Sequence, residues 1–198
     1  MKVPDEKVQP KVMFSNQQIQ KEVWRIAQEI AAHYREEVSD QNPLILVVVL
    51  KGGVFFGIDL ARCLAQLRVP HEFRFERVKS GWEDQRDSGE PAIFDPLTES
   101  LTGRHVLVVE DIVDSGKTLK AIQDHYSKLD PLSLSVAVML LRERQENGAT
   151  DPISRWVGFR TNERCWFVGY GMDSDELHRS LLYIGCLPGE ELPPGPIS

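Results

Sequence analysis

The sequence predicts an α/β fold in which a twisted, mainly parallel sheet is flanked by helices. The apolar run LILVVVL at residues 44–50 has strand length, β-branched residues and no alternation, which is typical of a strand buried on both faces. Predicted strands and helices then alternate along the chain, and this order favours parallel strands joined by right-handed crossovers. Because 198 residues is a single-domain length, we expect one domain over residues 1–198.

Four elements are expected in the first part of the chain. Ser15 and Gln18 form a capping box, and the apolar residues that follow recur at helical spacing. Pro70 ends the second helical stretch, and the strand after it alternates only in part, as exposed strands do. The predicted elements are a helix at residues 16–38, a strand at 44–50, a helix at 54–67 and a strand at 71–78.

A long segment without periodicity divides the predicted elements. Residues 79–103 are rich in Ser, Gly, Asp, Glu and Pro, and they exceed an ordinary connection, so we expect a flexible lid there. A disordered insertion without a role is the alternative. The elements predicted after it are a strand at 104–110, a helix at about 116–129 and a strand at 133–141, and the proline-rich tail PGEELPPGPIS is expected to fray.

Composition limits the classes of function. A formal net charge of −7 argues against general affinity for nucleic acid, which depends on surplus Lys and Arg. No apolar run approaches the roughly 18 residues of a membrane span. The N-terminal MKVPDEKVQPK has no continuous apolar region, so we expect a cytoplasmic protein. Cys63, Cys165 and Cys186 are widely spaced without CxxC, which predicts reduced, buried thiols.

The stretch VLVVEDIVDSGKTLKAI at residues 106–122 carries the clearest chemistry. An apolar strand leads to two adjacent acids, Glu110 and Asp111, then to a small-residue loop and a helix. At a helix N-terminus the unpaired amides and the helix dipole favour an anion. The predicted phosphate-binding residues are Ser115, Gly116, Lys117 and Thr118.

The acid pair narrows the class of phosphate ligand. A P-loop for nucleoside triphosphates needs a glycine where this chain has Asp111, so a P-loop kinase or phosphohydrolase is disfavoured. Carboxylates suit a ligand that also carries hydroxyl groups or a bound cation, as a ribose phosphate with pyrophosphate and Mg²⁺ does. Lys51-Gly52 and the acid pair both follow parallel strands, so we expect them to meet at one site.

These motifs resemble those of the type I phosphoribosyltransferases. Residues 106–118 fit the signature for 5-phosphoribosyl 1-pyrophosphate throughout. VVVLKGG at 47–53 and CWFVGYGMDSDELHRSLLYIGCL at 165–187 are similar to segments of the hypoxanthine-guanine phosphoribosyltransferases, and the resemblance spans nearly the whole chain. It implies the type I phosphoribosyltransferase fold with a small hood built from N-terminal and C-terminal segments, Mg²⁺ as cofactor, and a homodimer or homotetramer.

The resemblance also implies a reaction and a set of site residues. The reaction is transfer of the phosphoribosyl group from phosphoribosyl pyrophosphate to hypoxanthine or guanine, which gives IMP or GMP and pyrophosphate. Asp114 is the candidate catalytic base. Phosphoribosyl pyrophosphate is expected to contact Lys51, Gly52, Glu110, Asp111, Asp114, Ser115, Gly116, Lys117, Thr118 and Arg179. The purine is expected to contact Arg142, Trp166, Phe167 and Asp173, and Mg²⁺ to contact Glu110, Asp111 and Asp173. The Leu50-Lys51 peptide is expected to be cis.

Local chemistry alone leaves ordinary alternatives open for several of these residues. Asp114 suits an N-cap or Asx turn, and Lys117 suits an exposed first turn. Lys51 and Arg179 suit the protein surface, and Asp173 suits a loop. Trp166 and Phe167 suit a buried strand.

Two departures from the family pattern are visible. Arg142 stands where the family has a lysine that donates to the purine 6-oxo group; arginine also donates, but its planar head cannot occupy quite the same place. Because Glu143 and Arg144 follow Arg142, an alternative is that this segment is shifted in register relative to the family pattern. Ser80-Gly81-Trp82 replaces the usual Ser-Tyr of the long loop.

The function alternatives are a phosphoribosyltransferase for another base, such as xanthine or uracil, and a regulatory relative that binds nucleic acid. The acidic composition disfavours the second.

Overall fold

The structure, a computed structural model, describes residues 9–79, 91–94, 96, 98–143 and 154–188. Its elements are β1 (Lys11–Phe14), α1 (Asn16–Tyr34), β2 (Leu44–Leu50), α2 (Val54–Gln66), β3 (His71–Lys79), β4 (Ala92–Phe94), β5 (His105–Val113), α3 (Lys117–Tyr126), a 3₁₀ turn (Ser127–Leu129), β6 (Ser133–Arg142), β7 (Ser154–Thr161), β8 (Trp166–Val168) and β9 (Ile184–Leu187).

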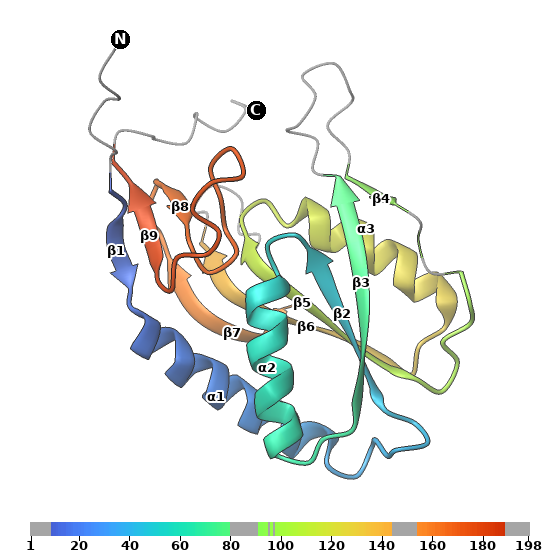
Figure 1. The fold of residues 1–198 in the computed structure, drawn as a ribbon. Helices are drawn as coiled ribbons and strands as arrows, with labels where there is room; N and C mark the ends of the chain where they lie inside the picture. The colour runs from blue at the N-terminus through green and yellow to red at the C-terminus, as the bar shows by residue number, and fades with distance from the viewer. Residues whose placement is uncertain (1–8, 80–90, 95, 97, 144–153, 189–198) are drawn as a thin grey trace.

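The main sheet has six strands in the order β4-β3-β2-β5-β6-β7 (Figure 1). Strands β3, β2, β5, β6 and β7 run parallel, and β4 is an antiparallel edge strand. The predicted α/β class with a mainly parallel sheet is therefore confirmed. The carboxyl ends of β2 and β5 lie at one edge of this sheet, where α/β proteins bind their ligands.

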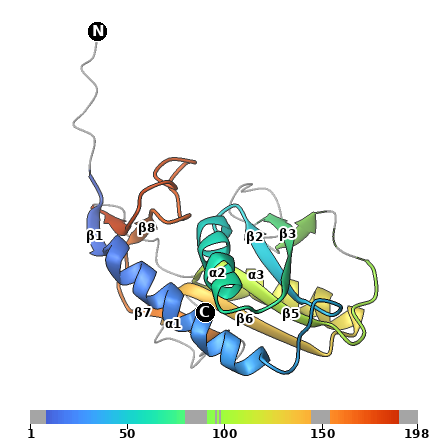
Figure 2. The ribbon, with the colours of Figure 1, turned by 60° about the horizontal axis from the view of Figure 1, so that its bottom comes forward.

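Helices cover both faces of the main sheet, and the alternation of strand side chains divides the core in two (Figures 1 and 2). Leu46 and Val48 of β2 pack with α1 and α2 in one core. Ile45 and Val47 of the same strand pack with α3 in the other. This explains why β2 is apolar at every position: both of its faces are buried.

A second, antiparallel sheet of order β1-β9-β8 forms the hood. It joins the N-terminal strand to two strands near the other end of the described chain, as the resemblance implied. The loop between β8 and β9 lies beside the carboxyl end of β2 (Figure 1). Gly171 of this loop packs so closely on Gly52 that a side chain at Gly171 would overlap the Gly52 carbonyl oxygen.

Most predicted elements are confirmed, with corrections to helix and strand bounds and with strands that were not predicted. Ser15 and Gln18 do form a capping box, but α1 ends at Tyr34 because the chain turns there, and Val38 packs on the core from outside the helix. Strands β1 and β9 were not predicted, because strands of four residues carry little periodicity, and β7 was missed because its buried and exposed positions do not alternate regularly. The segment 79–103 contains β4, which pairs with β3, while residues 80–90, including Trp82, lie outside the described residues, as does most of the tail.

The prediction of reduced thiols is wrong for two of the three cysteines. Cys165 and Cys186 form a disulfide, with their Cα atoms 5.8 Å apart. The antiparallel pairing of β8 with β9 brings them together, since Phe167 lies opposite Cys186. Cys63 is a free cysteine.

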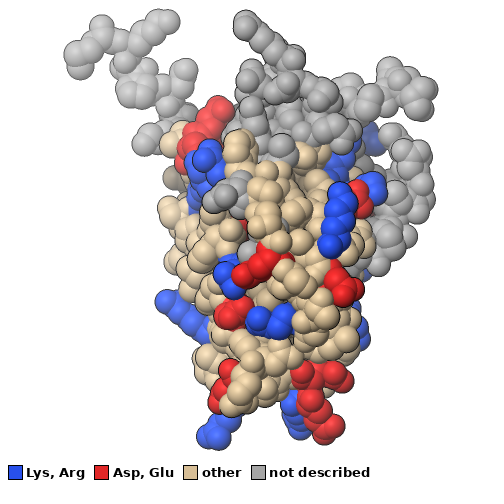
Figure 3. Space-filling view, turned by 90° about the vertical axis from the view of Figure 1, so that its right-hand side faces the viewer, with Lys and Arg blue, Asp and Glu red and all other residues tan. Residues whose placement is uncertain are grey.

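The face on the right-hand side of Figure 1 carries both acidic and basic side chains (Figure 3). Acidic and basic side chains alternate there over uncharged surface, without a broad basic patch on that face (Figure 3). Within the described parts of the chain, no helix has both the length and the apolar character to cross a membrane.

One buried polar bond ties α3 to the sheet. The Tyr126 hydroxyl donates to Glu76 Oε1 at 2.6 Å, and both residues are buried. We expect Tyr126→Phe to lower the free energy of unfolding by about 1–3 kcal/mol, because Glu76 loses its buried donor. Tyr34→Phe is the matched control, since the equally buried Tyr34 hydroxyl makes no hydrogen bond within the described residues. Urea unfolding measures both, and equal effects of the two variants would contradict this account.

Candidate active site

The acid pair lies where strand β5 loses one of its two neighbours. Pairing of β5 with β2 ends at Val109, whereas pairing with β6 continues to Val113. The sequence prediction that the strand ends at Glu110 is therefore corrected: β5 runs on to Val113, because Ile112 and Val113 still pair with β6. Beyond Val109 the backbone of Gly52, which follows the end of β2, approaches the Asp111 carboxylate in place of a paired strand.

Both acids are buried. Glu110 is 6% exposed and Asp111 7%. The Asp111 amide donates to Glu110 Oε1 at 3.1 Å, and the Ile112 amide donates to Asp111 Oδ1 at 2.9 Å. Burial, and for Glu110 also the neighbouring charge of Asp111, raises the pKa of both carboxyl groups above their ordinary values. A bound cation or a set of hydroxyl donors would offset the cost of ionising this pair.

Three backbone segments converge on Asp111. The Leu50-Lys51 peptide is cis, as the resemblance implied. A side chain at Gly52 would overlap the Asp111 carboxylate, and one at Gly171 would overlap Gly52. Glycine at these two positions thus allows the end of β2, the Asp111 carboxylate and the loop between β8 and β9 (residues 169–183, the hood loop) to touch. The prediction that Lys51-Gly52 and the acid pair lie together is confirmed, because Gly52 packs against the Asp111 carboxylate.

A network of charges lies over this contact. Arg179 Nη2 lies 2.8 Å from Asp173 Oδ1, and Arg179 Nη1 donates to the Gly171 carbonyl at 2.8 Å. Lys51 Nζ lies 2.8 Å from Glu176 Oε1, and Arg179 Nε lies 3.3 Å from Glu176 Oε2. The two predicted pyrophosphate contacts, Lys51 and Arg179, therefore share one carboxylate. Glu176 has no distinguishing signal in the sequence, because it is one of three acids in the segment DSDEL at residues 173–177.

The predicted phosphate loop has the expected form. Residues 114–116 connect β5 to α3, and Gly116 adopts a left-handed conformation with φ of 72° as the N-cap. Ser115 and Lys117 are exposed, and Thr118 is half-buried in the first turn. The helix was predicted over about 116–129. In the structure α3 ends at Tyr126, and the remaining predicted residues, Ser127–Leu129, form the 3₁₀ turn. The Lys117 amide donates to Ser115 Oγ at 3.5 Å, and the first turn of a helix in general leaves amide groups that can bind an anion.

Arg142 joins this loop to the segment that leads into β8. Its Nε lies 3.1 Å from Asp114 Oδ1, and its terminal nitrogens donate to the carbonyl oxygens of Glu163 and Cys165, the latter at 2.9 Å. The guanidinium also lies over the Phe167 ring, 4.9 Å from its centroid. Asp114, Arg142 and Phe167 are thus brought together, as a common purine site requires.

Trp166 precedes Phe167 in β8, and the residue is 38% exposed. Its indole N–H donates to the Asp173 carbonyl at 2.7 Å, which fixes the ring against the hood loop. A fixed, partly exposed ring suits stacking on a flat ligand. The third predicted purine contact of the hood, Asp173, is engaged through its side chain by Arg179.

Among the described residues, no group of three or more His, Cys, Asp or Glu side chains is arranged to hold a metal ion alone. The predicted set of Glu110, Asp111 and Asp173 is therefore not a closed metal site. The buried acid pair does fit a hard cation in its donor atoms, and Mg²⁺ commonly takes its remaining ligands from water and substrate phosphates.

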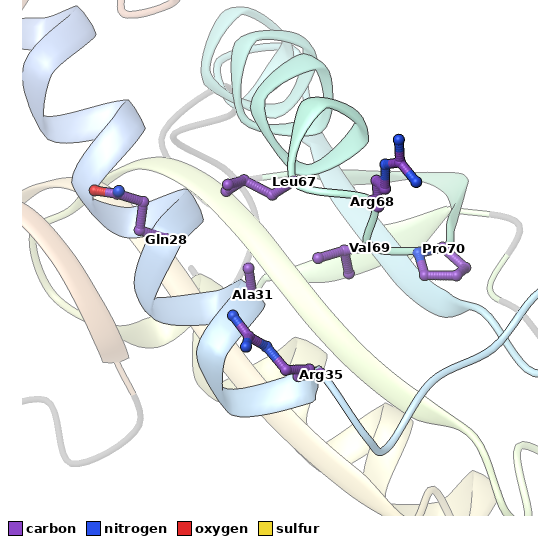
Figure 4. Close-up of a pocket in the computed structure, with 7 residues that line it drawn as sticks. All are labelled: Gln28, Ala31, Arg35, Leu67, Arg68, Val69 and Pro70. Carbon is purple, nitrogen blue, oxygen red and sulfur yellow. The ribbon is translucent and has the colours of Figure 1, made fainter.

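A pocket of about 200 Å³ lies elsewhere, between the C-terminal ends of α1 and α2 (Figure 4). It is lined by Gln28, Ala31, Arg35, Leu67, Arg68, Val69 and Pro70. Because Pro70 precedes β3, this pocket belongs to the amino ends of the strands, and it contains none of the predicted site residues.

Comparison with known proteins gives one family. A model of the phosphoribosyl transferase domain matches residues 15–175. The hypoxanthine-guanine phosphoribosyltransferase of Mycobacterium avium is 39% identical over 177 residues, which cover 89% of this chain and 84% of that protein. The hypoxanthine phosphoribosyltransferase of Haemophilus influenzae is 30% identical, over 91% of this chain and 96% of that protein.

Solved structures agree with these relatives. The hypoxanthine phosphoribosyltransferase of Trypanosoma cruzi in complex with the product IMP is similar with a TM-score of 0.81 and 30% identity, over 94% of this chain and 98% of that one. A variant of the same enzyme in a ternary complex with substrates is similar with a TM-score of 0.80 and 31% identity.

The raised pKa of the Glu110 carboxyl predicts how stability depends on pH. When folding raises a carboxyl pKa above its ordinary 4.5, the folded state binds more protons than the unfolded state, so stability falls as pH rises through the raised pKa. We expect Glu110→Gln to raise the melting temperature at pH 8, by about 2–4 °C per kcal/mol gained, and to change it less at pH 5.

Calorimetric melting of both proteins across this pH range measures the effect. Glu99→Gln, at an exposed ion pair with Arg74, is the control and should leave the pH dependence unchanged. If the Glu110→Gln protein melts at the same temperature as the wild type at both pH values, ionisation of the buried Glu110 carboxyl group does not destabilise the fold.

Proposed function

The chain belongs to the phosphoribosyltransferase family, with hypoxanthine-guanine phosphoribosyltransferases among its relatives, and we propose that it is a purine salvage enzyme. It transfers the 5-phosphoribosyl group of phosphoribosyl pyrophosphate to hypoxanthine or guanine and releases IMP or GMP and pyrophosphate. The observation that carries the proposal is the contact of Gly52 with Asp111 beside the phosphate loop, because it unites a phosphate cradle, buried acids and a close backbone approach. Both sheets contribute residues to this site, in keeping with one catalytic domain.

The phosphate loop and the acid pair are proposed to hold the sugar. The 5′-phosphate accepts hydrogen bonds from the amides and hydroxyls of residues 115–118, where the dipole of α3 also favours negative charge. Ionised Glu110 and Asp111 accept hydrogen bonds from the ribose hydroxyls. Binding therefore draws the pair toward its charged form, which the empty site disfavours.

The pyrophosphate is proposed to lie between β2 and the hood loop. The backbone of Lys51-Gly52 approaches it closely because Gly52 carries no side chain. The guanidinium of Arg179 and the ammonium of Lys51 neutralise the charge that develops as pyrophosphate leaves C1 of the ribose. A purine nitrogen forms the new bond to C1 from the opposite face.

The purine is proposed to stack on Trp166, beside Phe167, with its imidazole portion toward Asp114. Asp114 accepts the proton that the purine nitrogen must lose. Arg142 lies against Asp114 and donates to the 6-oxo group, which disfavours adenine because adenine presents an amine there. A guanidinium has five N–H donors, against three in lysine, so it suits contact with both the hood carbonyls and a base.

Mg²⁺ is proposed as the cofactor, held by Glu110, Asp111 and Asp173 together with oxygens of the substrate. When bound, it supplies positive charge that neutralises pyrophosphate and the acids.

The cytoplasmic location predicted from the N-terminal sequence stays a prediction.

The protein is proposed to form a homodimer or homotetramer. Four large apolar side chains are more than a third exposed on α2 and β3, namely Phe55, Ile58, Phe73 and Phe75. Phe73 and Phe75 stack on each other, with ring centroids 5.7 Å apart, beside α2. Exposed apolar surface of this kind is typical of protein interfaces. The oligomeric state of the T. cruzi relative has itself been a subject of structural work.

A product assay tests the reaction. Supplied with Mg²⁺, phosphoribosyl pyrophosphate and a panel of bases, the protein should form nucleotide with hypoxanthine or guanine. Asp114→Asn should lower the rate about 10²–10⁴-fold, because the purine proton loses its acceptor. Asp124→Asn, at an exposed ion pair on α3, is the control and should be as active as the wild type. Product only with xanthine, uracil or adenine would reject the assignment of the base, and no product with any base would reject catalysis.

Light scattering after size exclusion tests the interface. We expect Phe75→Asp to reduce the mass of the particle, because a charge in the centre of an apolar contact must be desolvated. Leu132→Asp, at a side chain 61% exposed ahead of β6, is the matched control and should keep the wild-type mass. A Phe75→Asp protein of unchanged mass would place the interface elsewhere.

A further inference from the structure

The hood loop contains a backbone turn that its residues do not favour. Ser174 and Leu177 exchange two backbone hydrogen bonds, of 3.3 and 2.9 Å, so residues 175 and 176 form the tip of a tight turn. Asp175 has a φ of 48° and Glu176 a φ of 64°. Turns with positive φ at both central residues normally carry Asn and Gly there. A glutamate at the second position is therefore a locally poor choice, and such exceptions concentrate at functional sites.

The Glu176 side chain contacts the two cations of the site. One carboxylate oxygen lies 2.8 Å from Lys51 Nζ and the other 3.3 Å from Arg179 Nε. Glu176 is exposed, so its carboxyl group is ionised at neutral pH, as glutamates in water are. One carboxylate thus bridges two cations. Lys51 lies 125 residues before Glu176 in the sequence, and Arg179 lies three residues after it.

A pyrophosphate group has the same chemistry as this carboxylate, with more charge. Its oxygens would accept from the same ammonium and the same guanidinium edge, and a carboxylate at that position would repel it. Arg179 itself does not depend on Glu176 for its place, because Asp173 and the Gly171 carbonyl hold its other edge, each at 2.8 Å. The position of Arg179 and the charge of Glu176 are therefore separable.

We propose that Glu176 is an internal competitor of pyrophosphate, which holds Lys51 and Arg179 in the empty enzyme and must give them up when phosphoribosyl pyrophosphate binds. The inference rests on the proposed function, since it takes these two cations as pyrophosphate contacts. It adds that Glu176 weakens the binding of phosphoribosyl pyrophosphate and, by returning to the cations, speeds the release of product pyrophosphate.

Glu176 is exposed, so its contacts have the strength of surface ion pairs. Two such pairs together correspond to about two- to thirtyfold in affinity. They are also screened by salt, so the effect of Glu176 must shrink as ionic strength rises.

Glu176→Gln tests the competition, because glutamine keeps the shape of the side chain and the backbone amide that donates to Asp173 Oδ2 at 2.8 Å. Binding of phosphoribosyl pyrophosphate with Mg²⁺, and of pyrophosphate with Mg²⁺, is measured by isothermal titration calorimetry at low and high salt. We expect both ligands to bind about two- to thirtyfold more tightly at low salt, with a smaller gain at high salt. The KM for the purine should not change, whereas inhibition by pyrophosphate should strengthen.

Asp175→Asn is the matched control. It changes the net charge equally, at the neighbouring exposed position of the same turn, and Asp175 makes no ion pair within the described part of the chain. It should leave both affinities as in the wild type.

The outcomes separate the inference from the proposed function. If the wild type binds no phosphoribosyl pyrophosphate, the proposed function fails. If the wild type binds it and Glu176→Gln binds equally or more weakly, Glu176 supports the site and does not compete with the ligand, so this inference alone fails. An equal gain in Asp175→Asn would reduce the effect to net charge and also reject the inference.

Discussion

The buried pair of carboxyl groups, Glu110 and Asp111, is the constraint on which the rest of the site depends. Two neighbouring buried acids at the end of a central strand cost free energy when they ionise. Burial of apolar side chains on both faces of the sheet stabilises the fold and offsets this cost. The surroundings follow from the pair. Gly52 leaves room for the Asp111 carboxylate, and Arg179 donates to the carbonyl of Gly171, which packs on Gly52.

Local chemistry accounts for the parts that the sequence predicted. The capping box of Ser15 and Gln18, the doubly buried strand at residues 44–50 and the acid pair before the loop at 115–118 each depend on residues within about ten positions. The meeting of Gly52 with Asp111 was also predictable, because parallel strands present their carboxyl ends at one edge. The family resemblance supplied the hood and the candidate roles.

The parts that the sequence missed depend on partners far along the chain. Strand β5 continues beyond Glu110 because β6 pairs with it, and β1 and β9 are strands because the two ends of the described chain meet. The disulfide follows from the pairing of β8 with β9. Glu176 carries no local signal, since its significance comes from Lys51, 125 positions earlier. Short, non-local pairings of this kind leave no periodic pattern in the sequence.

Proton release on binding tests the central claim most directly. If phosphoribosyl pyrophosphate with Mg²⁺ ionises the buried pair, its binding must expel protons, and calorimetric titration in buffers of different ionisation enthalpy counts them. We predict that the wild type releases more protons than Glu110→Gln does at the same pH, because only the wild type has the Glu110 carboxyl to ionise. Equal release by the two proteins would contradict the account.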